Sequence, residues 1–389
     1  MTKKWSSRLT FFAFVVLMVG LGSNDSLRGI FSTIFQEHFS LTTTQLGLIV
    51  TASYIGNLVF LLVGGNLSTR FSKKRVLQML ILIWMAALAL FAFTSNYTVL
   101  LIGMALALGS STLLNTTMNL ITPLLFATAP GFFVNFLFFT QEIGTSGSQY
   151  ILGSHADGFA FWQHTNLVLL ILGAVAFVLL LFCNVPEEAA DPADTPAQKG
   201  GYDWRIIVPY VLVFGFYFIA EHGVMNWMVA YGVDGLGLPQ ASAAKYLSVF
   251  FGGMMIGRLC LSPLVDKLGA LKSLAAFGGV SCVLYLIGSL GGAVTMPVWA
   301  ISGLSFSILY PTLVMSIRLY FPAQQVSGAA GTILSIASLA DILFNVGFGR
   351  LVDTLGYGVS IYVLPLAMAA FIITFLAFSR GHGKEQQKN

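Results

Sequence analysis

Four carboxylates stand inside long apolar stretches of this chain. An acidic side chain at the centre of a bilayer costs about 2.5–3.5 kcal/mol on insertion scales, so it normally faces a bundle interior or a water-filled path. In that setting a carboxylate can exchange a proton or accept hydrogen bonds from a hydroxylated ligand. We expect all four to be candidates for proton coupling: Asp25, Glu142, Glu221 and Asp341.

Glu221 has aromatic neighbours at helical spacing. Tyr217, Trp227 and Tyr231 fall on the same side of a helix as Glu221 at 100° per residue. Aromatic rings stack on the C–H faces of sugars and a carboxylate accepts from their hydroxyls, so this face suits a polyhydroxylated ligand. The alternatives are aromatic packing between helices and a purely structural, hydrogen-bonded Glu221. His222 lies about 100° away from Glu221, and we interpret it as an interhelix histidine, with proton exchange as the lesser alternative.

Polar stripes on other apolar stretches offer further ligand contacts. Amides are the preferred groups because they both donate and accept, although about half of such small polar residues are expected to join helices at about 0.6 kcal/mol each. We expect the substrate to be bound by Asn24, Asn115, Asn119, Gln141, Glu142, Tyr217, Glu221, Trp227, Tyr231 and Asn345.

Asp25 and Arg28 are spaced to share a helix face. Either Asp25 is a titrating proton carrier tuned by Arg28, or the two form a permanent salt bridge that holds the first span in place. Other charged residues near the ends of apolar stretches are expected to form gating or interhelix ion pairs. With Arg28, this group comprises Arg70, Arg258, Asp266, Arg350 and Asp353.

The composition requires a membrane around these residues. Of 389 residues, 57% are hydrophobic and 9% are charged, against roughly 25% charged in ordinary soluble domains. With about 20 apolar residues per span, we predict an all-α membrane protein with twelve transmembrane helices and a lipid bilayer around it. The predicted spans are 9–35, 44–69, 76–94, 98–122, 131–152, 164–184, 205–231, 243–265, 270–290, 293–319, 326–351 and 357–379.

The spans divide into two halves of six. A stretch rich in proline and acidic residues, 185–204, predicts a cytoplasmic linker between bundles at 1–184 and 205–389. Lys and Arg gather near the two termini and in the 2–3 and 8–9 loops, so both termini should be cytoplasmic in a multi-pass protein of the cell (plasma or inner) membrane. We expect a monomer, and the net charge of +4 gives no reason to expect a nucleic-acid partner.

The four acids occupy matching places in the two halves. Asp25 and Glu142 are 117 residues apart, while Glu221 and Asp341 are 120 residues apart. Repeated six-span halves with sites near the midplane describe a secondary transporter.

Loop motifs resemble those of the major facilitator superfamily. Residues 65–75, Gly-Asn-Leu-Ser-Thr-Arg-Phe-Ser-Lys-Lys-Arg, resemble its Gly-x-Leu-x-Asp-Arg-x-Gly-Arg-Lys signature, with Thr69 in place of Asp and Ser72 in place of the second Gly. Residues 262–269 and 349–356 resemble the related elements of the second half. The resemblance covers essentially the whole chain and implies a twelve-helix transporter in two pseudo-symmetric halves.

Within that superfamily the chain resembles the fucose–galactose–glucose:proton symporter group. The resemblance rests on Tyr217-x3-Glu221-x5-Trp227-x3-Tyr231, on Tyr-Pro-Thr at 310–312, and on residues 114–119. That group has Glu where this chain has Asn115, so its usual proton carrier is missing here. An Asp in the first span is functional in those symporters, which implies a proton-carrying role for Asp25.

The predicted function is proton-coupled symport of a small polar solute, most plausibly a monosaccharide, by alternating access. A sodium gradient stays open as the driving force, and no other cofactor is expected. The alternatives are a proton-coupled multidrug efflux antiporter and an organic-anion transporter. We expect no metal site, no catalytic residue and no enzymatic activity, since neither a nucleotide-binding motif nor a metal-spaced cluster occurs.

Overall fold

The computed structural model describes residues 3–126, 130–183, 185–186 and 202–386. The described part of the chain contains helices and no strand. It divides into two compact units, Met1–Pro192 and Ala193–Asn389, and each is described by itself. Most of the predicted linker lies outside the described residues.

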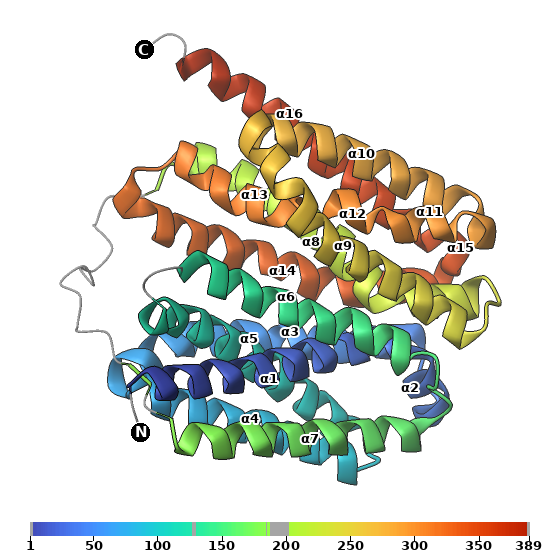
Figure 1. Cartoon of the computed structure of the whole chain (residues 1–389). Helices are drawn as coiled ribbons and strands as arrows, with labels where there is room; N and C mark the ends of the chain where they lie inside the picture. Colours follow the sequence, from blue (N-terminus) through green and yellow to red (C-terminus); the bar gives the residue numbers. More distant parts are fainter. Residues whose placement is uncertain (1–2, 127–129, 184, 187–201, 387–389) are drawn as a thin grey trace. The chain divides into compact units, whose positions relative to one another are not determined.

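The first unit consists of six long helices and one short one, which lie side by side (Figure 1). The short helix, α2, follows the first long helix directly. The helices are α1 (Lys3–Ile30), α2 (Ser32–Phe39), α3 (Thr43–Arg70), α4 (Lys73–Phe93), α5 (Tyr97–Leu125), α6 (Pro130–Ile151) and α7 (Phe159–Leu181).

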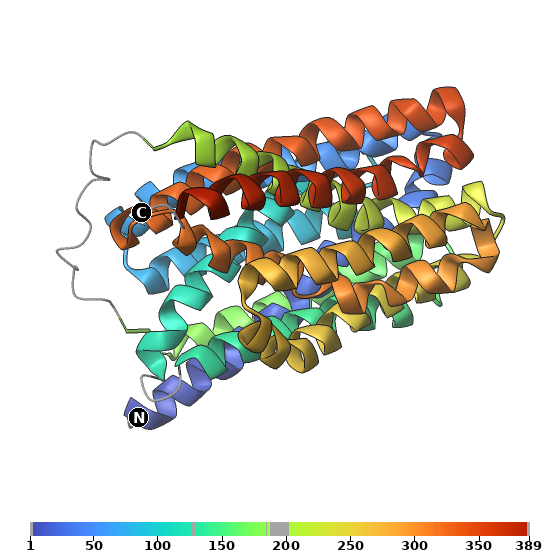
Figure 2. The same ribbon diagram turned by 90° about the horizontal axis from the view of Figure 1, so that it is seen from above.

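The second unit repeats this plan with more interruptions. Its long helices also run beside one another, as Figure 2 shows from a second direction. The elements are α8 (Trp204–Ala230), η1 (Tyr231–Gly235), α9 (Gln240–Leu268), α10 (Ala270–Leu290), η2 (Gly292–Val294), α11 (Met296–Ile301), α12 (Gly303–Phe306), α13 (Leu309–Ser316), η3 (Ile317–Leu319), α14 (Ala323–Leu355), α15 (Tyr357–Ser360) and α16 (Val363–Gln386).

The helices are long and apolar enough to cross a membrane. Eleven spans of the described residues meet this description by length and composition. The helix α6, which carries the polar stripe of the predicted fifth span, has 22 residues and completes the twelve. The predicted all-α, twelve-helix fold is therefore confirmed.

Four predicted spans differ in detail from the observed helices. The first, predicted as one segment over 9–35, is two helices, since α1 ends at Ile30 and α2 begins at Ser32. The seventh continues past its predicted end as a π-helical turn to Gly235. The tenth, predicted as one segment over 293–319, is a chain of short helical pieces. The twelfth, predicted as one segment over 357–379, is two helices, since α15 ends at Ser360 and α16 begins at Val363.

Serine hydroxyls and a proline account for the broken tenth span. The hydroxyls of Ser302, Ser305 and Ser307 each donate to the carbonyl three residues earlier. Such local bonds compete with the helical ladder and bend helices. Pro311 lies within α13 and has no N–H to continue the ladder.

Glycines let α1 and α6 of the first unit approach closely. A Cβ on Gly22 would collide with the backbone carbonyl of Gln141, and a Cβ on Gly144 would collide with that of Val19. The hydroxyl of Ser23 donates across the same crossing to the Gly144 carbonyl at 3.3 Å. Small residues at such crossings allow backbones to pack directly in a membrane.

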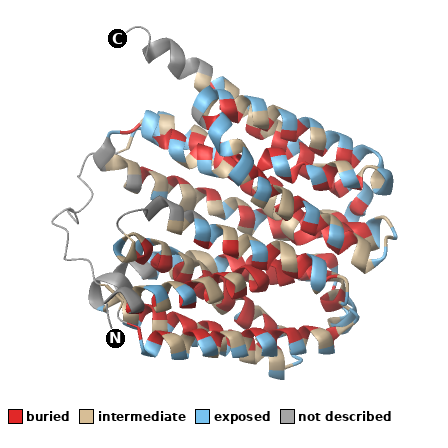
Figure 3. Ribbon diagram, in the orientation of Figure 1, coloured by how far each residue is buried: buried red, intermediate tan, exposed pale blue. Residues whose placement is uncertain are grey.

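Buried and exposed residues alternate along the helices of each unit (Figure 3). Large apolar side chains are exposed on both units, for example Leu62 at 67% in the first and Leu343 at 74% in the second. Lipid tails are as apolar as such side chains, so these surfaces suit contact with a bilayer.

Candidate functional site

Asp25 lies in α1, half-buried and bonded to a neighbouring helix. Its Oδ2 accepts a hydrogen bond from Ser111 Oγ of α5 at 3.1 Å, and its buried Oδ1 has no partner among the described residues. Arg28 is 5% exposed, interacts electrostatically with Asp25, and stands over the ring of Tyr54 at 5.9 Å. Asp25 therefore keeps one oxygen for a proton or a ligand, while Arg28 is engaged from two sides.

Three predicted ligand amides form one hydrogen-bonded chain between α5 and α6. Asn119 Nδ2 donates to Asn115 Oδ1, and Asn115 Nδ2 donates to Gln141 Oε1, both at 2.6 Å. All three side chains are half-buried, as is that of the neighbouring Glu142. The chain presents both donors and acceptors, which is the chemistry that a hydroxylated ligand needs.

Asn24 of α1, a predicted substrate contact, is bonded to a tryptophan of α4. Its side-chain oxygen accepts from the indole N–H of Trp84 in α4 at 3.2 Å, and the residue is 5% exposed. This placement favours a packing role between α1 and α4 over the predicted substrate contact.

Glu221 of the second unit lies among tyrosines. Its side chain is 13% exposed, and it interacts electrostatically with Tyr217 of α8, Tyr285 of α10 and Tyr310 of α13. The ring of Tyr217 stacks on that of Phe306, with centroids 4.9 Å apart. A carboxylate among aromatic rings matches the prediction for Glu221 and Tyr217, although Tyr217 is itself fully buried.

Trp227, Tyr231 and Asn345 are engaged inside the second unit. The indole N–H of Trp227 donates to Asn345 Oδ1 at 2.8 Å, and Asn345 Nδ2 donates to the backbone carbonyl of Asp341 at 2.7 Å. The ring of Tyr231 packs against Trp299, with centroids 6.2 Å apart. Trp227 and Asn345 are fully buried and Tyr231 is 3% exposed, so all three side chains pack between helices in this structure.

His222 is the residue whose surroundings the sequence did not reveal. Its Nδ1 lies 2.8 Å from Asp341 Oδ2, and its Nε2 lies 3.9 Å from Glu221 Oε2. The histidine does join two helices, as expected, but its partner on α14 is one of the four candidate acids. In the sequence, Asp341 is recognised as the residue equivalent to Glu142 in the other half. That equivalence does not reveal that Asp341 contacts His222 of α8.

A model of the Major Facilitator Superfamily matches residues 10–334. The chain belongs to the Major Facilitator Superfamily. Members of this family are transporters and not enzymes, which confirms that part of the prediction. Within the described ranges no three His, Cys, Asp or Glu residues gather as a metal site.

Three comparisons refine the placement within the Major Facilitator Superfamily. A glucose/galactose transporter of Brucella abortus biovar 1 (strain 9-941) is 26% identical over 357 residues, covering 86% of this chain and 85% of the relative. The L-fucose-proton symporter of Escherichia coli (strain K12) is 24% identical over 333 residues, covering 74% and 75%. The crystal structure of a D-xylose-proton symporter has a TM-score of 0.76 at 16% identity, covering 97% of each chain, and shows the same fold.

The predicted gating residues of this superfamily member fall into three groups. Arg258 is half-buried and interacts electrostatically with Tyr217 and Tyr310, so it belongs to the surroundings of Glu221. Arg350 and Asp353 are exposed near the end of α14. The remaining two predictions concern side chains outside the described part: Arg70 and Asp266.

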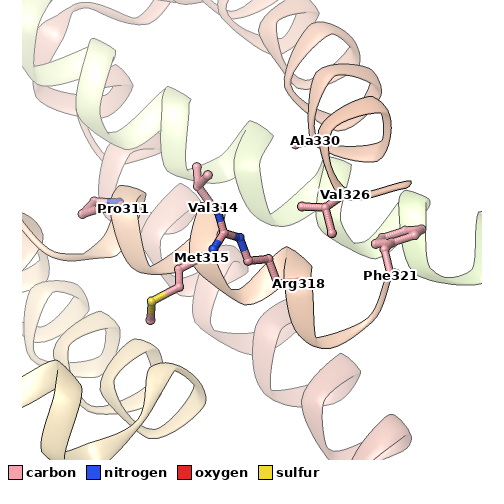
Figure 4. A pocket seen from close by; sticks show the side chains of 7 residues that line it. All are labelled: Pro311, Val314, Met315, Arg318, Phe321, Val326 and Ala330. Atoms are coloured by element: carbon pink, nitrogen blue, oxygen red, sulfur yellow. The ribbon is translucent and has the colours of Figure 1, made fainter. Parts of the chain in front are cut away.

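A hollow of about 790 Å³ lies along α13 and α14 (Figure 4). Its lining is apolar except for Arg318. None of the predicted site residues lines it. The lining residues are Pro311, Val314, Met315, Arg318, Phe321, Val326 and Ala330.

Proposed function

We propose that this protein is a proton-coupled symporter that works by alternating access. Its proposed substrate is a small polar solute, a monosaccharide. The observation that carries the proposal is the amide chain of Asn119, Asn115 and Gln141, with donors and acceptors that suit sugar hydroxyls. The names of the two curated relatives, a glucose/galactose transporter and an L-fucose-proton symporter, support the same substrate class.

Asp25 is the proposed proton carrier of the first unit. One oxygen is bonded to Ser111 and the other has no partner among the described residues. The resemblance to the sugar:proton symporters implies an acid at the position of Asn115, and this chain has an amide there, so we assign proton exchange in this unit to Asp25, with Glu142 as the second acid. In the second unit Glu221 and Asp341 complete the proposed proton-coupling set.

The membrane arrangement is also proposed. Bundles at 1–184 and 205–389 are joined by a cytoplasmic linker at 185–204, and both termini face the cytoplasm. Clusters of Lys and Arg near the termini support this orientation because cytoplasmic loops carry an excess of these residues. The monomer is the proposed working form, with lipid and one small solute as its partners.

Transport by purified full-length protein in liposomes tests this function. D-glucose, D-galactose, L-fucose and D-xylose are offered with and without an imposed inward proton gradient, and a sodium gradient forms a separate arm. We expect at least one sugar to accumulate only when the proton gradient is present. Movement of lipophilic cations without any sugar would favour a drug antiporter, and movement of carboxylates alone would favour an organic-anion carrier.

A further inference from the structure

His222 bridges two acids on two different helices. Its Nδ1 lies 2.8 Å from Asp341 Oδ2 on α14, while its Nε2 lies 3.9 Å from Glu221 Oε2 on its own helix. An ionised carboxylate only accepts hydrogen bonds, so the contact with Asp341 places the proton of a neutral ring on Nδ1. Nε2 is then the basic nitrogen, and it faces Glu221.

We propose that His222 is the proton-carrying group of the second unit, held in place by Asp341 and exchanging its proton at Nε2 on the side of Glu221. The proposal rests on proton-coupled symport as the function. It gives the second unit a titrating group distinct from the carboxylates themselves.

The burial of the three side chains suits this division of roles. The side chain of Asp341 is 2% exposed, whereas those of His222 and Glu221 are 23% and 13% exposed. Asp341 can therefore orient the ring from inside the unit, and the other two can be reached from outside it. The ring of Phe218 stacks on the imidazole at 5.4 Å with an interplanar angle of 10°, which further fixes its orientation.

Asn345 and Trp227 form a second hydrogen-bonded pair, which is also bonded to the backbone of Asp341. Asn345, one turn later on α14, donates to the backbone carbonyl of Asp341 at 2.7 Å and accepts from Trp227 at 2.8 Å. This pair ties α14 to α8 at a second point. The geometry at His222 is thus supported by neighbours that do not titrate near neutral pH.

Other titratable and charged groups lie around Glu221. They come from three elements packed around α8 and from α8 itself. These groups are Tyr217 of α8, Arg258 of α9, Tyr285 of α10 and Tyr310 of α13. Arg258 interacts electrostatically with Tyr217 and Tyr310, so it belongs to the same surroundings.

The proposed step is a simple proton exchange. Nε2 takes a proton from water or from a protonated Glu221, and the ring becomes an imidazolium between two carboxylates. The N–H bond at Nε2 breaks again when the proton leaves, which restores the neutral ring. The net charge of His222, Glu221 and Asp341 together rises by one when the proton comes from water and falls by one when it returns to water, whereas a transfer from Glu221 to Nε2 leaves it unchanged.

His222→Asn separates a proton carrier from a structural tie. The Asn side-chain amide can still donate to Asp341 from near the Nδ1 position, but it cannot take up a proton. In liposomes we expect His222→Asn to lose at least tenfold in sugar accumulation under an imposed proton gradient. Exchange of labelled for unlabelled sugar at equal pH on both sides, which needs no net proton movement, should stay within threefold of wild type. Accumulation at the wild-type level in His222→Asn would overturn the proposal.

A matched control and a spectroscopic readout complete the test. His164→Asn replaces an exposed histidine of the first unit and should leave both assays unchanged. Nitrogen NMR of ¹⁵N-histidine protein in lipid, with His222 assigned by difference against His222→Asn, should record its ring changing charge between pH 5 and pH 8. A ring that keeps one charge state over that range would also overturn the proposal. If wild type moves no sugar, the symport function fails, and the NMR result still decides whether His222 exchanges a proton.

Discussion

The helix pairs α1–α6 and α8–α14 hold equivalent places in the two repeats, yet different groups join them. In the first unit, glycine backbones meet directly, with Gly22 against Gln141 and Gly144 against Val19. In the second, a Cβ added to Gly215 would lie 3.4 Å from the Cβ of Ala340, and two polar links join the helices: the His222–Asp341 contact and the Trp227–Asn345 hydrogen bond. The first pair is joined by close backbone packing, whereas the links of the second include groups that can titrate.

This difference indicates where each unit handles a proton. The acid of α1, Asp25, accepts a hydrogen bond from Ser111 of α5. The acid of α14, Asp341, lies within the α8–α14 contact. Proton exchange at Asp25 would therefore act on the contact between α1 and α5 and leave the α1–α6 crossing unchanged, whereas exchange at His222 would change the charge within the α8–α14 contact.

Asp25→Asn should have the largest effect, because it removes the proposed proton carrier and keeps the shape. We expect proton-driven sugar accumulation to be abolished and sugar exchange at equal pH to persist. Both are measured as labelled sugar in liposomes, with the exposed Asp157→Asn as the control. Sugar accumulation at the wild-type level in Asp25→Asn would contradict the proposal that Asp25 carries a proton.

Gly22→Ala and Gly215→Ala compare the two crossings by stability. The Gly22 variant forces a methyl group against a backbone carbonyl, and overpacking costs about 1–3 kcal/mol. The Gly215 variant makes an ordinary contact with Ala340 and should cost little. Thermal unfolding of the two purified variants is the measurement. Equal loss of stability in both would contradict the difference drawn between the crossings.

Asn115→Ala breaks the amide chain at its centre. Loss of hydrogen bonds to a ligand at about 1–1.5 kcal/mol predicts roughly tenfold weaker sugar binding. The apparent KM for sugar exchange measures this, and Thr116→Ala, on an exposed neighbour bonded to its own helix, should leave KM unchanged. An unchanged KM in Asn115→Ala would place the ligand away from α5.

Trp84→Phe and Trp227→Phe should have the smallest effects. Each removes one indole hydrogen bond, to Asn24 in the first unit and to Asn345 in the second, at about 0.5–1.5 kcal/mol of stability. Only Trp227→Phe loosens the support of Asp341, so it alone should weaken proton-driven accumulation. Equal sugar accumulation in the two variants would show that the Trp227–Asn345 hydrogen bond does not contribute to proton coupling.

The fold followed readily from the sequence, because apolar length and interrupting loops define the spans. The broken tenth span was missed, since serine back-bonding in a continuous apolar run leaves the hydropathy unchanged. The division of α1 from α2 was missed for a similar reason.

The candidate site was only partly predictable. Helical spacing placed Asn115 and Asn119 on one face, and the structure joins them to Gln141. It could not tell that Trp227 and Tyr231 face neighbouring helices, because a shared face with Glu221 does not identify what that face meets. The partner of His222 depends on how α8 and α14 pack, which is a contact over 119 residues of sequence.

The central claim is that sugar and proton move together through this protein. Its most direct test is the external pH of a weakly buffered suspension of liposomes that contain the purified protein, with no gradient imposed. Addition of a transported sugar should raise the external pH as protons enter with it, and a proton ionophore should abolish the rise. Entry of the sugar with no change in external pH would contradict the account.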